Sequence, residues 1–355
     1  MTTPPPPNPR PSSAQNARQE SPHHDPVPLS KKLVLIGHGF RSMIKRYPKD
    51  FASAVRRTTK GTRRNAEGAP FADRWADAVA KAAPTDIIAS WLGHCTVLLH
   101  LDGKTIITDP VLSERIGMKV GGVTVGPARL NEVPVPPDAL PPIDLVIISH
   151  AHFDHLDRDT LKHLATKRTE VLTASSTRGL IPRGFAHIHE LRWNHETDLL
   201  GFHFAALKPA HWGARTAYDR HRGFNSYAIS THPPANAPAD FAPPPRRILF
   251  AGDTAMTKAF DKAGPFDLGI FGIGAYNPWH DAHATPEQVW TMAQKAGVKR
   301  ILPVHHSTFK LSEEPIEEPL QRLLKAADLH DGKRDADPAG MRAILDCEIG
   351  QIVKA

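Results

Sequence analysis

The stretch from Leu145 to Asp157, LVIISHAHFDHLD, constrains this chain more than any other part of the sequence. It begins with an apolar, β-branched run that predicts a fully buried strand. Three histidines and an aspartate follow within six residues, and folding alone does not require so many polar side chains at one strand end. The pattern His-x-His-x-Asp-His is typical of a metal site. A polar loop that caps the next helix is the simpler alternative.

The four polar residues of this motif divide into two pairs. His150 and His152 are two positions apart at a strand end, so their side chains point the same way and can bind one ion. Asp154 and His155 turn away from that ion and can reach a second one. Such a site needs further His or Asp ligands from other loops.

Three later residues stand at strand ends, where such ligands are expected. His211 follows a strand and precedes a Trp-Gly turn, Asp253 follows the apolar run 247–250 through Ala-Gly, and His305 follows the run 301–304. Singly, each has a structural explanation, because Gly-Asp-Thr also forms turns and helix caps. His306 competes with His305 as the ligand.

Length and composition indicate a globular protein. The chain has 355 residues, of which 40% are hydrophobic, enough for one large or two ordinary domains. It has no run of 18 apolar residues and begins without the apolar segment of a secretory signal, so we expect neither a spanning helix nor Sec export. Cys95 and Cys347 have no metal or redox spacing and are expected to be buried thiols in a reducing cytoplasm.

The positive charge lies at the amino terminus. Residues 1–64 carry thirteen Lys and Arg against three acidic residues, whereas the whole chain has a net charge of +7, so the remainder is slightly acidic. Residues 1–30 are rich in Pro and predict a disordered tail. Residues 31–70 predict a basic amphipathic arm, interrupted at Pro48. This arm either packs on the body of the protein or binds an anionic membrane surface.

The rest of the chain predicts one layered α/β domain over residues 71–355. Strands followed by helices occur twice, which favours two similar halves packed together. The elements that matter most here are helices near 72–83, 158–165, 286–296 and 315–327, a hairpin at Asp102-Gly103 between strands 96–101 and 104–108, and a strand over 199–207.

The order of the metal-ligand candidates resembles that of the metallo-β-lactamase superfamily, over about residues 86–310. The resemblance implies a four-layer αββα sandwich and a dinuclear zinc site. The ligands that it implies are His150, His152 and His211 for one zinc ion, Asp154, His155 and His305 for the other, and Asp253 as the bridge between them.

Six short stretches resemble a narrower branch, that of N-acylphosphatidylethanolamine-hydrolysing phospholipase D and its bacterial relatives. They are residues 91–96, 108–111, 209–212, 272–278, 283–287 and 305–309. The chain departs from this branch at His306 and Ser307, where Trp-Gly is frequent, and at Trp279, where an Arg is frequent. These departures concern a pocket wall, and therefore the substrate, rather than the metals.

This resemblance implies a zinc-dependent hydrolase, of phosphodiesterase or phospholipase D type, that acts on N-acyl phosphatidylethanolamine or a related phospholipid. Zinc lowers the pKa of water and stabilises charge that develops on substrate oxygens. Asp154 has an implied second role in moving a proton. His283 is implied to contact the substrate phosphate or the leaving oxygen, with a surface or capping histidine as the alternative. His94 and Asp109 resemble residues that orient metal ligands.

Other activities use the same ligands on other substrates. A lactonase-like, carbonyl-directed hydrolase is the first alternative, and a nucleic-acid phosphodiesterase is the second. The basic segment lacks aromatic stacking repeats, so we expect no nucleic-acid partner. A membrane-associated binding protein with a silent site is a third alternative. We expect a cytoplasmic protein, peripheral on the inner face of the membrane if the basic arm binds lipid. The oligomeric state stays open between a monomer and a homodimer.

Overall fold

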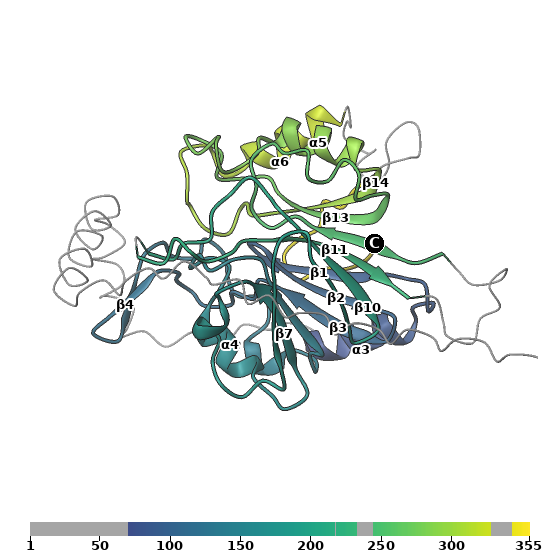
Figure 1. The fold of residues 1–355 in the computed structure, drawn as a ribbon, viewed down its shortest axis with the longest axis horizontal. Helices are drawn as coiled ribbons and strands as arrows, with labels where there is room; N and C mark the ends of the chain where they lie inside the picture. Colours follow the sequence, from purple (N-terminus) through teal and green to yellow (C-terminus); the bar gives the residue numbers. More distant parts are fainter. Residues whose placement is uncertain (1–69, 217, 233–243, 328–342) are drawn as a thin grey trace, which may run out of the picture.

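The structure, a computed structural model, describes residues 70–216, 218–232, 244–327 and 343–355. The predicted disordered tail and nearly all of the predicted basic arm lie outside these residues. The described chain forms four layers, in the order helices, sheet, sheet, helices (Figure 1). The predicted αββα fold class is therefore confirmed.

The first sheet has seven strands in the order β16-β1-β2-β3-β6-β7-β8. Their bounds are β1 (Ile88–Gly93), β2 (Thr96–Leu101), β3 (Lys104–Thr108), β6 (Leu145–Ile148), β7 (Glu170–Ala174), β8 (Ile188–Leu191) and β16 (Ile352–Lys354). The predicted hairpin joins β2 to β3, with φ of 49° at Asp102 and 73° at Gly103, as a tight two-residue turn requires. Strands β3, β6, β7 and β8 are parallel, so their carboxyl ends meet at one edge.

The second sheet has seven strands in the order β15-β14-β13-β12-β11-β10-β9. Their bounds are β9 (Glu196–Leu199), β10 (Phe202–Leu207), β11 (Ser226–Thr231), β12 (Arg247–Phe250), β13 (Phe266–Gly272), β14 (Val298–Val304) and β15 (Ala343–Ile344). Strands β10, β12 and β14 run in the same direction, so the residues that follow them meet at one edge of this sheet.

The single strand predicted over residues 199–207 is wrong. A turn at Leu200 and Gly201, with φ of 53° and 89°, separates β9 from β10, which pair antiparallel. Leu200 continues the apolar run through this turn, so the sequence pattern does not reveal it.

Apolar side chains of both sheets form the central core, including Leu99 and Ile147 from the first sheet and Phe204, Tyr227 and Phe250 from the second. Separate clusters attach the outer helices (Figure 1). These are α3 (Phe71–Ala80) and α4 (Arg158–Leu164) on the first sheet, and α5 (Pro286–Lys295) and α6 (Glu318–Ala326) on the second. The remaining elements are the hairpin β4 (Met118–Val120) and β5 (Val123–Val125) and the short helices η1 (Pro137–Ala139) and η2 (Arg178–Leu180).

The sequence also predicts buried free cysteines and no membrane-spanning helix. Cys95 and Cys347 are buried and form no disulfide, as expected. None of the helices in the described part of the chain has both the length and the apolar character that crossing a bilayer requires.

Candidate metal centre

The His-x-His-x-Asp-His motif forms the loop between β6 and α4. The backbone turns at His152, whose carbonyl oxygen accepts hydrogen bonds from the N–H groups of His155 (3.2 Å) and Leu156 (2.9 Å). Asp157 then caps α4 by accepting a hydrogen bond from the N–H of Asp159 at 3.1 Å. The loop therefore follows from a buried strand, a tight turn and a helix cap, which place four polar side chains at the sheet edge.

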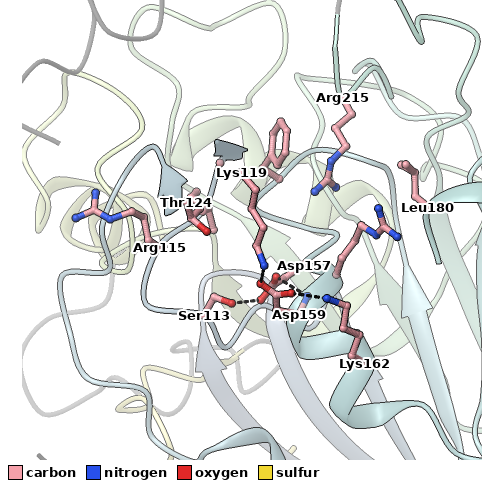
Figure 2. A pocket seen from close by; sticks show the side chains of 13 residues that line it. Ser113, Arg115, Lys119, Thr124, Asp157, Asp159, Lys162, Leu180 and Arg215 are labelled. Carbon is pink, nitrogen blue, oxygen red and sulfur yellow. Dashed lines mark hydrogen bonds and ion pairs between the residues drawn. The ribbon is translucent and has the colours of Figure 1, made fainter. Parts of the chain in front are cut away.

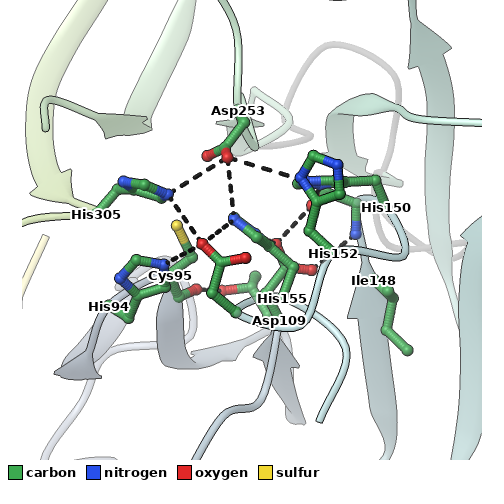
Figure 3. A network of polar contacts seen from close by, with 12 residues as sticks. His94, Cys95, Asp109, Ile148, His150, His152, His155, Asp253 and His305 are labelled. Atoms are coloured by element: carbon green, nitrogen blue, oxygen red, sulfur yellow. Dashed lines mark hydrogen bonds and ion pairs between the residues drawn. The ribbon is translucent and has the colours of Figure 1, made fainter. Parts of the chain in front are cut away.

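The fold brings all seven ligand candidates together in two groups. Figure 3 labels His150, His152, His155, Asp253 and His305 among them. Within each group, one nitrogen or oxygen atom per residue lies within 4.8 Å of the corresponding atom of every other member. The first group contains His150, His152, His211 and Asp253, and the second contains Asp154, His155, His305 and Asp253. Asp253 belongs to both groups.

Asp253 lies at the middle of the site. Its Oδ2 atom is 3.1 Å from His155 Nε2 and 3.3 Å from His305 Nε2. The same atom is 3.6 Å from His211 Nε2. Gly252 makes this approach feasible, since its φ is 57° and a Cβ there would lie 2.9 Å from the Cβ of Ser149.

Asp109 orients His150 and His155 of the motif through direct and indirect hydrogen bonds. This buried carboxylate follows β3, and its Oδ2 lies 2.6 Å from His155 Nδ1. It also accepts hydrogen bonds from the backbone N–H (2.7 Å) and the hydroxyl (2.5 Å) of Ser149. Ser149 Oγ in turn lies 2.8 Å from His150 Nδ1. Asp109 therefore directs the Nε2 atoms of His150 and His155 towards the centre, as outer partners of metal ligands do.

Two further contacts fix other candidates. His211 Nδ1 lies 3.0 Å from the carbonyl oxygen of Ala282, and His94 Nε2 lies 3.0 Å from Asp154 Oδ2. Several non-glycine residues here have left-handed backbones, with φ of 48° at His94, 32° at Asp109 and 61° at His305. Such strained residues often cluster at functional sites.

The donor set suits a bound divalent cation. Buried polar atoms at the centre, namely His155 Nε2, His305 Nε2 and Asp253 Oδ1, make no hydrogen bond to any of the described residues. An unsatisfied buried polar atom costs about 1–3 kcal/mol, so several in one place need a partner. Imidazole nitrogens and carboxylate oxygens are the ligands that zinc takes in proteins.

Burial and the two carboxylates together set the ionisation states at the site. Burial lowers the pKa of His152 to about 4, which keeps its ring neutral. Burial would raise the pKa of Asp253, but the surrounding histidines hold it well below its usual value. Burial would lower the pKa of His305, yet Asp253 and Asp154 raise it to about 9. A metal ion bound through His305 would displace this proton.

The centre opens into a cleft of about 250 Å³. The residues that line it are His152, Asp154, Trp212, Asp253, Ala275, Trp279, His283, His305 and Leu311. His283 is therefore no surface histidine, and its Nδ1 lies 3.9 Å from Asp253 Oδ2, although it belongs to neither ligand group. Trp279 lies on the cleft wall, where the sequence departs from the phospholipase D branch.

His306 faces away from the centre. Its ring stacks on Trp91 with a centroid distance of 4.7 Å, and its Nδ1 lies 2.9 Å from Ser307 Oγ. The structure therefore brings His305, rather than its neighbour, to the other ligand candidates.

Sequence reasoning missed two features of the site. Cys95 lies under the centre, with its sulfur within 4.8 Å of donor atoms of His94, His155 and His305, and burial raises the pKa of its thiol. Trp212 forms a cleft wall, and its place directly after His211 is the signal that could have indicated this role.

Comparisons with known proteins agree with this architecture. Residues 104–306 match a family described as the β-lactamase superfamily domain. An uncharacterized protein of Mycobacterium tuberculosis is 35% identical over 254 residues, which cover 68% of this chain and 64% of that relative. The chain thus matches less than two thirds of that relative's length. The N-acyl-phosphatidylethanolamine-hydrolyzing phospholipase D 1 of Caenorhabditis elegans is 27% identical over 291 residues, which cover 76% of each chain.

Solved structures show similarity in the fold alone. A possible metal-dependent hydrolase from Veillonella parvula has a TM-score of 0.55 at 14% identity, covering 77% of this chain and all of that one. An isothiocyanate hydrolase from Delia radicum gut bacteria has a TM-score of 0.53 at 16% identity, covering 75% of this chain and 98% of that one.

Proposed function

This chain belongs to the β-lactamase superfamily of metallo-hydrolases, and we propose that it is a dinuclear zinc phosphodiesterase of phospholipase D type. N-acyl phosphatidylethanolamine or a related phospholipid is the proposed substrate, which the name of the Caenorhabditis elegans relative supports. The observation that carries the proposal is the position of Asp253, shared by two ligand groups at the base of one cleft.

In this proposal the two groups each hold one ion. His150, His152 and His211 would hold the first, Asp154, His155 and His305 would hold the second, and Asp253 is available to both. Zinc bound there would lower the pKa of water and stabilise charge on the substrate oxygens.

The chain's own residues prepare the site for this chemistry. Asp109, through Ser149 and His155, keeps the histidine Nε2 atoms directed at the cleft. Asp154 stays ionised because the neighbouring histidines hold its pKa well below the usual range, although burial would raise it. A contact with His94 Nε2 holds Asp154 Oδ2 in place. We assign Asp154 a second role as the group that accepts a proton from water or returns one to the leaving oxygen.

His283 is the proposed contact to the substrate phosphate. Burial lowers the pKa of its ring to about 4, so the ring is neutral and carries one N–H that can donate to a phosphate oxygen.

The cleft also offers apolar surface. Trp212 and Trp279 are 45% and 36% exposed, although large apolar side chains are usually buried, and both line the cleft. Their indole faces would contact the apolar part of a phospholipid. The basic segment over residues 31–70, nearly all of it outside the described residues, would hold such an enzyme at an anionic membrane surface.

A substrate panel tests this function. We expect the zinc-loaded protein to hydrolyse N-acyl phosphatidylethanolamine and a bis-aryl phosphate in preference to a lactone and a β-lactam, because the cleft combines a phosphate-binding histidine with two aromatic walls. The measurement is kcat/KM for all four substrates in one buffer, with a chelator-treated sample as the control. Faster turnover of the lactone than of either phosphodiester would instead support the carbonyl-directed alternative.

A further inference from the structure

A second cavity, of about 310 Å³, lies beside the loop that carries the metal-ligand candidates (Figure 2). Its walls come from the region of the β4–β5 hairpin, the start of α4 and the segment after His211. Five of its lining residues are cationic, namely Arg115, Lys119, Arg158, Lys162 and Arg215. Three segments that are distant in the sequence thus place cationic side chains around one cavity.

The two carboxylates in this lining already have partners. Asp159 forms ion pairs with Lys119 and, at 2.9 Å, with Lys162. Asp157 accepts hydrogen bonds from the hydroxyl of Ser113 at 2.5 Å and from the N–H of Asp159 at 3.1 Å. Figure 2 shows these contacts gathered at one side of the cavity. With five cationic side chains against two carboxylates, the lining carries an excess of positive charge.

The guanidinium of Arg215 is held by backbone carbonyl oxygens and an aromatic ring. Its Nη1 atom donates to the carbonyl oxygens of Ala151 (3.1 Å) and Leu156 (2.7 Å), and its guanidinium lies 3.9 Å from the ring centre of Phe153. Burial lowers its pKa to about 10. The carboxylates of Asp157 and Asp219 act on this guanidinium through longer-range attraction, which opposes the effect of burial on its pKa.

We propose that this cavity binds a phosphate-bearing anion, at a site separate from the metal centre. A guanidinium presents several donors in a planar fork that matches phosphate oxygens, and Arg158 lines the same cavity as Arg215. The volume admits a phosphate group with a small organic portion.

Such an anion would contact the metal-ligand loop. Phe153 lies between His152 and Asp154 in the sequence, lines the cavity and stacks under Arg215. The guanidinium that faces the anion is thus the same group that holds the carbonyl oxygens of Ala151 and Leu156. The ligand would therefore bind one side of the loop while the metal ions bind the other.

Calorimetric titration of glycerol 3-phosphate into the full chain tests the proposal, both metal-replete and after chelation. The informative variant is Arg158→Ala combined with Lys162→Ala, because both side chains are exposed and neither is a ligand candidate. We expect this double variant to bind the probe at least about tenfold more weakly in both metal states. Arg168→Ala, an exposed arginine outside the cavity, is the matched control and should bind like wild type.

Co-sedimentation with phosphatidylcholine vesicles that contain phosphatidic acid identifies the source of the phosphate. Vesicle binding that is lost in the double variant, without binding of the soluble probe, assigns the cavity to a lipid head group. The reverse pattern assigns it to a soluble phosphoester. The proposal is overturned if wild type binds neither, if the double variant binds like wild type, or if the probe binds only the metal-replete form. Because binding is read in the chelated protein, this outcome does not depend on the proposed hydrolase activity.

Discussion

Replacing Asp253 with alanine should abolish hydrolysis and remove metal from the protein. Its Oδ2 atom lies within 3.6 Å of Nε2 atoms of His155, His305 and His211, and it is the one residue common to both ligand groups of the described centre. Loss of the shared carboxylate disrupts both positions at once, so we expect kcat/KM to fall by at least about a thousandfold. The measurements are metal content by elemental analysis and turnover of a bis-aryl phosphate.

Asp281→Ala is the matched control, because Asp281 is an exposed carboxylate two residues before His283 and lies outside both ligand groups. It should retain both metal ions and activity. If the Asp253→Ala variant folded normally and kept wild-type turnover, the central carboxylate would have no role in the reaction.

Replacing His283 with alanine should separate turnover from metal binding. The ring lines the cleft but belongs to neither ligand group, so the variant should keep its metal content. Loss of its hydrogen bond to the phosphate should lower kcat/KM by about 10²–10³-fold, as is typical when one positioned donor to a developing negative charge is removed. Parallel measurements of kcat, KM and metal content check this expectation.

His280→Ala, three residues earlier and exposed, is the control for this variant and should behave like wild type. If His283→Ala lost metal together with activity, His283 would be a ligand. If it lost neither, the substrate contact proposed for it would be wrong.

The sequence predicted most of the strand framework because burial leaves a clear pattern. Apolar runs that end in a His or Asp marked the ends of β6, β12 and β14, and the structure brings those residues together. The choice between His305 and His306 could not be made in this way. Both follow the same strand. The family resemblance favours His305, and the stacking of His306 on Trp91 shows that the His306 ring faces away.

Other features depend on contacts between distant segments and leave no local signal. The turn at Leu200 is apolar, so the sequence pattern predicts a strand there. The cationic cavity joins residues near 115, 158 and 215, each of which is an ordinary charged residue in its own stretch. The net charge of the chain after residue 64 is slightly negative, so the composition gives no indication of a cationic cavity.

Elemental analysis of the full chain, combined with turnover of a bis-aryl phosphate, tests the dinuclear metal centre most directly. We predict about two zinc ions per chain, loss of turnover when a chelator removes them, and recovery when zinc is restored. Full hydrolysis by a preparation shown to be free of metal would contradict the account.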